Sequence, residues 1–63
     1  MEKEDLVGRY FVNEATRIQA VSDPGGDLLV VEVVEAGDGA FGPAGTQWET
    51  SYHDLMSGWN LVP

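Results

Sequence analysis

Five short segments of the chain carry the pattern of apolar and polar residues that is typical of β-strands. Residues 16–22 and 46–52 place apolar and polar side chains at alternate positions, which is the period of a half-buried strand. Residues 6–12 and 28–36 are rich in β-branched or aromatic residues, and residues 59–62 alternate again before the terminal proline. The pattern therefore predicts strands over these five segments.

The segments between the first four strands contain residues that favour turns and loops. Asn13 and Glu14 predict a tight reversal, and residues 23–27, in which a proline precedes two glycines, predict a turn between antiparallel strands. Residues 37–45 are too rich in glycine to form a regular element, so we expect a loop that Phe41 anchors.

Residues 51–58 predict one helical turn just before the last strand. Ser51 stands three residues before Asp54, as in a capping box, and Gly58 is suited to end the turn in the left-handed conformation.

The segment 28–36 is apolar on both of its faces, although a small β-domain can bury only one face of a strand along its whole length. If Leu29, Val31 and Val33 point into the core, the residues between them point outward. We expect this outward face to be a contact surface for a protein partner, because exposed apolar patches often mark interfaces. Its residues are Leu28, Val30 and Val34, with Glu32 and Glu35 as a charged rim.

The order of five short strands with a helical turn before the last one resembles the SH3-like barrel. The resemblance covers residues 6–62, and it implies an all-β fold in which a single domain, residues 1–63, forms a small five-stranded barrel with one short helical turn before the last strand. In such barrels the first and last strands pair and leave no long free edge. Leu55, Trp59, Leu61 and Val62 also make the chain similar to small SH3-like accessory proteins of bacteria and their phages.

The sequence departs from two better-known relatives of that fold. Signalling SH3 domains bind proline-rich peptides with a long first loop, which here is only Asn13–Ala15, so we do not expect that ligand. The related Tudor domains hold methylated side chains in a cage of aromatic rings, since cations bind well over aromatic faces. The residues that could supply such a cage are Tyr10, Phe11, Trp48, Tyr52 and Trp59, although aromatic residues at strand spacing usually belong to a core.

The charge of the chain is strongly negative and unevenly distributed. Among 63 residues, eleven acidic and three basic side chains give a net charge of −8, and no Lys or Arg follows Arg17. A surface of this sign repels phosphate backbones, so we expect no direct binding of nucleic acid. The same charge also keeps a protein soluble.

The absence of cysteine and the presence of one histidine leave neither disulfides nor a histidine-rich metal site to support the fold. The chain begins with acidic residues where a signal peptide is basic, and its longest apolar stretch is far shorter than the ~20 residues of a membrane helix. We therefore expect a cytoplasmic protein that does not contact the membrane.

Three motifs suggest catalytic or ligand-binding chemistry, and simpler explanations account for each. Gly37, Gly39 and Gly42 have the spacing of a dinucleotide-binding loop, but Pro43 stands where the required helix would begin. His53 is next to Asp54 and near Ser51 and Ser57, but neighbours on a helical turn point in different directions, so His53 is expected on the surface.

Asp23 and Asp27 could share a calcium ion, but such an ion takes six to eight oxygen ligands, and turn formation explains both residues. We therefore expect no catalytic residues, no metal and no cofactor.

Together these observations predict a small acidic module that binds a protein and is not an enzyme. Its partner is a larger protein that it modulates, as a phage or bacterial accessory protein would do, or a second copy in a homodimer. Two alternatives remain open. The acidic residues could mimic DNA and inhibit a nucleic-acid-binding protein, or the chain could be a structural subunit of a phage or bacterial assembly.

Overall fold

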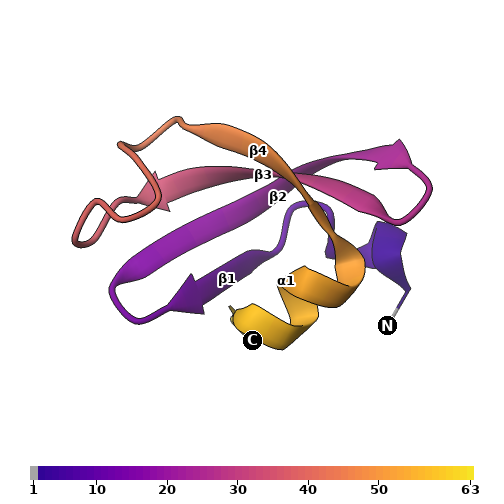
Figure 1. Ribbon diagram of the computed structural model, residues 1–63. Coiled ribbons are helices and arrows are strands. Elements are labelled where there is room, and N and C mark those ends of the chain that lie inside the picture. Colours follow the sequence, from indigo (N-terminus) through magenta and orange to yellow (C-terminus); the bar gives the residue numbers. More distant parts are fainter. Residues whose placement is uncertain (1) are drawn as a thin grey trace.

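The computed structural model describes residues 2–63 and contains one antiparallel sheet with two short helical segments (Figure 1). The elements, in chain order, are the 3₁₀-helix η1 (Lys3–Leu6), β1 (Tyr10–Asn13), β2 (Thr16–Gly25), β3 (Leu28–Glu35), β4 (Gln47–Ser51), the helix α1 (Tyr52–Gly58) and β5 (Asn60–Leu61). The predictions of five strands and of a short helical segment before the last strand are confirmed.

The strands are arranged in the order β4-β3-β2-β1-β5. Strands β1 to β4 follow one another as hairpins, and β5 returns to pair with β1. In that last pairing Phe11 is opposite Leu61 and Val12 is opposite Asn60. The predicted pairing of the first and last strands is therefore confirmed.

The sheet is open, which differs from the expected closure without a long free edge. β4 and β5 lie at the two ends of the strand order and are not paired with each other. Helix α1 begins directly after β4 and ends just before β5, so it carries the chain across the open side of the sheet. β5 then pairs with β1 over only two residues, and β4 has no strand beyond it, so its outer edge is free.

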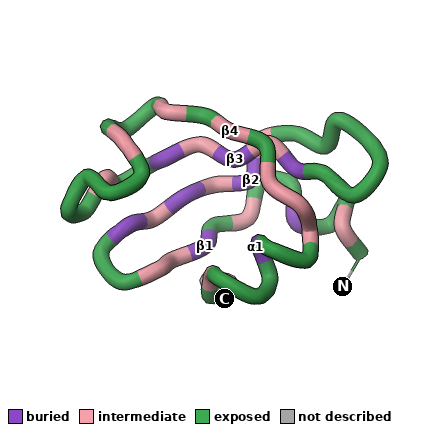
Figure 2. Tube along the Cα trace, in the orientation of Figure 1, coloured by how far each residue is buried: buried purple, intermediate pink, exposed green. Residues whose placement is uncertain are grey.

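The core lies on one face of the curved sheet. Buried and less buried residues alternate along β2 and β3, as the sequence pattern predicted (Figure 2). Leu6 from η1 and Leu55 from α1 are fully buried against this face. The buried apolar residues are Leu6, Phe11, Ile18, Ala20, Leu29, Val31, Val33 and Leu55. Burial of each large apolar side chain among them contributes about 1.5–3 kcal/mol.

The first strand is shorter than predicted, because the chain turns before it. Leu6 belongs to η1, which starts with a capping box between Glu2 and Asp5. Gly8 has a φ of +92°, which an extended strand does not use, and its N–H donates to the carbonyl of Ala20 at 2.7 Å. β1 therefore begins only at Tyr10.

The turn predicted over residues 23–27 is narrower in the structure. β2 runs to Gly25, and only Gly26 and Asp27 separate it from β3. Register shifts around Ser22 allow a proline within β2, and the Asp23 carboxylate accepts a hydrogen bond from the Gly25 N–H at 3.0 Å.

The end of α1 also differs from the prediction. Gly58 is the last residue of the helix but is not left-handed, and Trp59 caps the helix with its N–H, which donates to the Leu55 carbonyl at 3.1 Å.

Candidate binding surface

The outer face of β3 presents the apolar residues that the sequence singled out. Leu29, Val31 and Val33 are buried, whereas 40% of Leu28 and 37% of Val34 remain exposed and Val30 is half-buried. The predicted orientation of the strand is therefore confirmed. Among the apolar residues of this face, the two most exposed, Leu28 and Val34, lie near the two ends of the strand.

The neighbouring strands leave this face uncovered because the residues opposite are small or polar. Val30 has Ser22 of β2 on one side and Glu49 of β4 on the other. Leu28 has Gly25 and Ser51 as its partners. None of these side chains is large and apolar, so the outer ends of Leu28 and Val30 face solvent.

A β-bulge explains why two successive residues, Val34 and Glu35, are both exposed. Arg17 is opposite Glu35 and Ile18 is opposite Val33, so Val34 is the extra residue between the two pairs. Alternation alone would have turned one of the two exposed residues inward.

The two acidic residues predicted as the rim are each paired. Glu32 accepts a hydrogen bond from the Gln47 side chain at 2.7 Å. The Glu35 carboxylate lies 3.5 Å from the Arg17 guanidinium, and both side chains are largely exposed, so this ion pair contributes little to stability. The five residues predicted for the surface thus lie together on β3, with carboxylates along the apolar residues.

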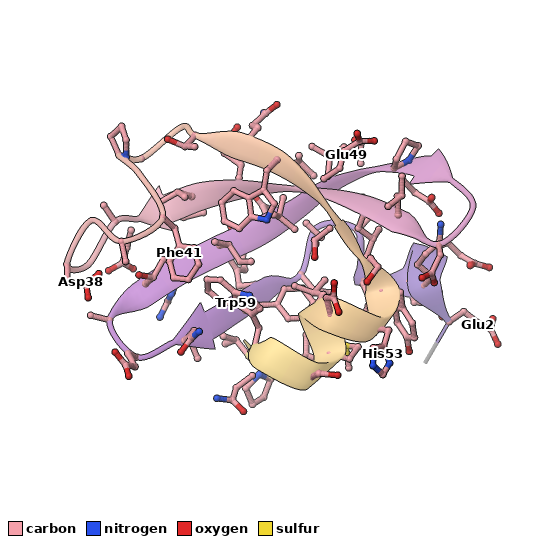
Figure 3. All side chains as sticks on the ribbon, in the orientation of Figure 1. Glu2, Asp38, Phe41, Glu49, His53 and Trp59 are labelled. Atoms are coloured by element: carbon pink, nitrogen blue, oxygen red, sulfur yellow. The ribbon has the colours of Figure 1, made fainter. Side chains whose placement is uncertain are left out.

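The structure also brings together an aromatic cluster, formed by Phe41, Trp48 and Trp59, that the sequence did not predict. The Phe41 ring stacks on Trp48 with centroids 5.9 Å apart, and its centroid is 5.0 Å from that of Trp59. The centroids of the two tryptophans are 6.5 Å apart. Phe41 belongs to the 37–45 loop, Trp48 to β4, and Trp59 lies between α1 and β5. Phe41 and Trp59 are labelled in Figure 3. Phe41 therefore anchors the loop, as expected.

The five residues considered for a cation cage do not meet at one place. Phe11 is buried in the core, and Tyr10 is exposed on β1. The aromatic cluster contains only two of the five residues, Trp48 and Trp59, which pack with Phe41. The part of the chain that the structure describes has no surface pocket.

The glycines of the dinucleotide-like motif allow the backbone of the 37–45 loop to adopt positive φ and to pack closely on its neighbours. A Cβ on Gly37 would lie 2.6 Å from the backbone of Ala15, and a Cβ on Gly42 would lie 2.8 Å from the Thr46 hydroxyl. β4 follows the loop, and no helix N-terminus is present there to face a phosphate.

His53 is exposed on α1, as predicted (Figure 3). The hydroxyl groups of Ser51 and Ser57 form hydrogen bonds with backbone groups of α1. Ser51 accepts a hydrogen bond from the Asp54 N–H at 3.0 Å, and Ser57 donates to the His53 carbonyl at 2.7 Å.

Lys3 joins η1 to the hairpin between β2 and β3. Its ammonium lies 2.6 Å from the Asp23 carboxylate and also donates to the carbonyls of Gly26 and Leu28. The hydrogen bond from Lys3, assisted by the Gly25 N–H, lowers the pKa of Asp23. Within residues 2–63, no group of three His, Asp or Glu side chains is placed to hold a metal ion.

Fold and surface together define a small, mostly-β single sheet that displays an acidic and apolar outer face. Within the described residues, no helix is long and apolar enough to cross a membrane. Comparison with family models, with curated proteins and with solved structures gives no match for this chain.

Proposed function

We propose that this protein is a small acidic binding module, without enzymatic activity, that docks on a larger protein through the outer face of β3. Leu28, Val30 and Val34 would contact the partner, and Glu32 and Glu35 would form the rim. The position of Leu28, Val30 and Val34 on one face of one strand carries the proposal, because apolar residues that are grouped on an exposed face mark interfaces more often than isolated ones do.

We also propose that the fold is a relative of the SH3-like barrel, and the strand order supports this. The order of five strands with a short helix before β5 is the feature on which the resemblance rests, and the pairing of β5 with β1 is what the resemblance implied. The same resemblance favours the class of small accessory proteins of bacteria and phages, which act on a larger protein in the cytoplasm.

The charges on the molecule favour a partner with a basic rim around an apolar centre. Two of the three basic side chains are in ion pairs, Lys3 with Asp23 and Arg17 with Glu35, and the net charge of the chain is −8. The remaining acidic side chains therefore dominate the field around the protein and disfavour nucleic acid.

Variant-dependent capture of partners tests this proposal. Immobilised wild-type protein, Val30→Lys and Met56→Lys are each exposed to an extract of the source cells at low and moderate salt. Met56 lies on α1 and is 41% exposed, so Met56→Lys makes the same change of charge and polarity away from β3. We expect a protein that binds the wild type and Met56→Lys but is lost with Val30→Lys. Equal retention by all three proteins would contradict the proposal.

The same experiment separates the alternatives. A DNA mimic would hold its partner through carboxylates, so both lysine variants would weaken binding alike and salt would abolish it steeply. A homodimer or structural subunit would appear as self-association in light scattering that Val30→Lys removes.

A further inference from the structure

We propose that the free edge of β4 pairs with an extended basic segment of the partner, which becomes a sixth strand of the sheet. The inference rests on the proposed function in one respect, namely that the partner is a protein. It concerns a different part of the surface from the outer face of β3, so the two can be tested apart.

The backbone of β4 has unpaired groups along one side. Val33 donates to the Thr46 carbonyl and Tyr52 donates to the Asp27 carbonyl, which fixes the hydrogen-bonded positions of the β3–β4 ladder. In an antiparallel pair these positions alternate, so Trp48 and Thr50 bond to β3, whereas Gln47 and Glu49 direct their N–H and C=O groups to the opposite side. No strand lies there, because β4 ends the sheet.

The only protection of this edge among the residues of β4 is the charge of Glu49, which opposes pairing with an acidic strand but not with a basic one. Natural edge strands are guarded by lysine, proline or a bulge, or they are very short. β4 has five residues, contains neither lysine nor proline, and pairs with β3 without a register shift. The opposite edge of the sheet, β5, has only two residues. The edge of β4 is therefore the place where another strand can add to this sheet.

Side chains on the two faces of β4 indicate what the added strand would be. Gln47 and Glu49 are exposed on the outer face, and Glu49 points away from Phe41 and Trp59 in Figure 3. Trp48 lies on the inner face, half-buried against Phe41. A strand beside β4 would place alternate side chains next to Glu49 and next to the aromatic cluster. Basic residues suit the first position and apolar residues suit the second.

A second copy of the chain fits this edge poorly. Antiparallel pairing of two β4 strands about their centre would place Glu49 directly opposite its counterpart, and like charges in that position are destabilising. Each copy also carries a net charge of −8. A basic segment meets neither difficulty.

Two synthetic peptides test the inference: an alternating Val-Lys heptapeptide that begins and ends with valine, and the same peptide with a backbone N-methyl group on each lysine, since the lysines are the residues opposite Gln47 and Glu49 whose N–H groups face β4. The readout is hydrogen exchange at the amides of the ¹⁵N-labelled protein. We expect the first peptide to slow exchange at Gln47 and Glu49 by about tenfold or more, since these N–H groups gain a partner. The N-methylated peptide has the same charge but has lost the donors that face β4, and it should leave both amides unchanged. Equal effects of the two peptides, or none, would overturn the inference.

Variants at residue 49 provide the second arm. Glu49→Pro removes the edge N–H without breaking a bond to β3, and Glu49→Gln retains the N–H but removes the charge. We expect the proline variant to lose peptide binding and the glutamine variant to weaken it in a salt-dependent way. Should Glu49→Pro fail to fold, N-methylation of Glu49 in a synthetic chain removes the same donor. Binding by a folded protein without this donor, as tight as that of the wild type, would overturn the inference.

Val34→Lys distinguishes the two proposals, because Val34 is exposed on the outer face of β3 but lies outside the β3–β4 ladder, so the new charge is not opposite Glu49. A failure of the outer face as a docking site leaves peptide protection at Gln47 and Glu49 intact. A failure of the edge leaves the capture of partners through Val30 intact.

Discussion

Gly37 and Glu14 are two residues at which the backbone of this small domain adopts a positive φ, which most side chains disfavour. Gly37 has a φ of +60° and lies so close to Ala15 that no side chain fits. Glu14 has a φ of 55°, which makes it the one non-glycine residue with positive φ among residues 2–63. At the first position glycine relieves the constraint, and at the second the chain accepts strain to close the β1–β2 hairpin.

Gly37→Ala is predicted to destabilise the protein by at least about 2 kcal/mol, because left-handed strain adds to a backbone collision. Gly39→Ala is the matched control, since Gly39 has a φ of +82° but open space around it, and should cost about 1 kcal/mol. Urea denaturation of both variants measures the difference in the free energy of unfolding. Equal losses would show that the contact with Ala15 has no energetic weight.

Glu14→Gly is predicted to stabilise the protein by up to about 1 kcal/mol. Glycine adopts positive φ without steric cost, although part of the gain is offset by the greater entropy of the unfolded chain. Thermal denaturation at pH 7 measures the effect, with Ala15→Gly as a control at the adjacent turn position. A lower melting temperature for Glu14→Gly would contradict the strained geometry.

The Lys3–Asp23 pair is predicted to make stability depend on pH in the acid range. The folded-state pKa of Asp23 is lowered from 3.8, so the stabilisation is complete above that value and is lost as the pH falls through the folded pKa. Lys3→Met should therefore have a lower melting temperature than the wild type at pH 7, and the difference should shrink below about pH 4. The bonds of Lys3 to Gly26 and Leu28 do not titrate, so part of the difference should remain. A difference that stays constant from pH 7 to pH 2 would exclude the pair as its cause.

At the scale of elements, the register between β3 and β4 determines what surrounds the outer face. Val30 is directly opposite Glu49. A charge introduced at residue 30 therefore meets a carboxylate across the strands, at the distance where such pairs interact.

Val30→Lys is predicted to be more stable than Val30→Glu by about 0.5–1 kcal/mol, because the first forms an attractive cross-strand pair and the second a repulsive one. The gap should narrow in high salt and in the Glu49→Gln background. Chemical denaturation of the variants measures it. If both variants instead unfold the domain, Val30 belongs to the core and the register is wrong.

At the scale of the whole molecule, the last five residues join parts of the chain that are distant in sequence. β5 covers the edge of β1, Val62 donates to the Tyr10 carbonyl at 2.9 Å, and Trp59 packs on Phe41 and Trp48. Without these contacts the free edge and the exposed aromatic surface would both grow.

Deletion of residues 59–63 is predicted to abolish cooperative unfolding, because a small domain has only about 5 kcal/mol of stability to lose. Deletion of Pro63 alone is the control and should change little, since this residue is exposed. Near-ultraviolet circular dichroism and urea titration measure both. A cooperative transition in the longer deletion would show that β1 to β4 fold without β5.

The sequence by itself determined the features that depend on local repetition. Alternation along β3 assigned Leu29, Val31 and Val33 to the core and Leu28 and Val30 to the outer face, because successive side chains of a strand must point to opposite sides. Ser51 and the glycines of the 37–45 loop likewise marked the start of α1 and the irregular segment, since capping and positive φ are local requirements.

Only the tertiary structure decided the features that depend on the path of the whole chain. The bulge at Val34 arises from the register with β2, and the 3₁₀-helix η1 is tied to a distant hairpin through Lys3. The meeting of Phe41, Trp48 and Trp59 and the free edge of β4 depend on where α1 takes the chain after Ser51. Such contacts join residues far apart in sequence, and a pattern with a period of two residues does not encode which distant segments will meet.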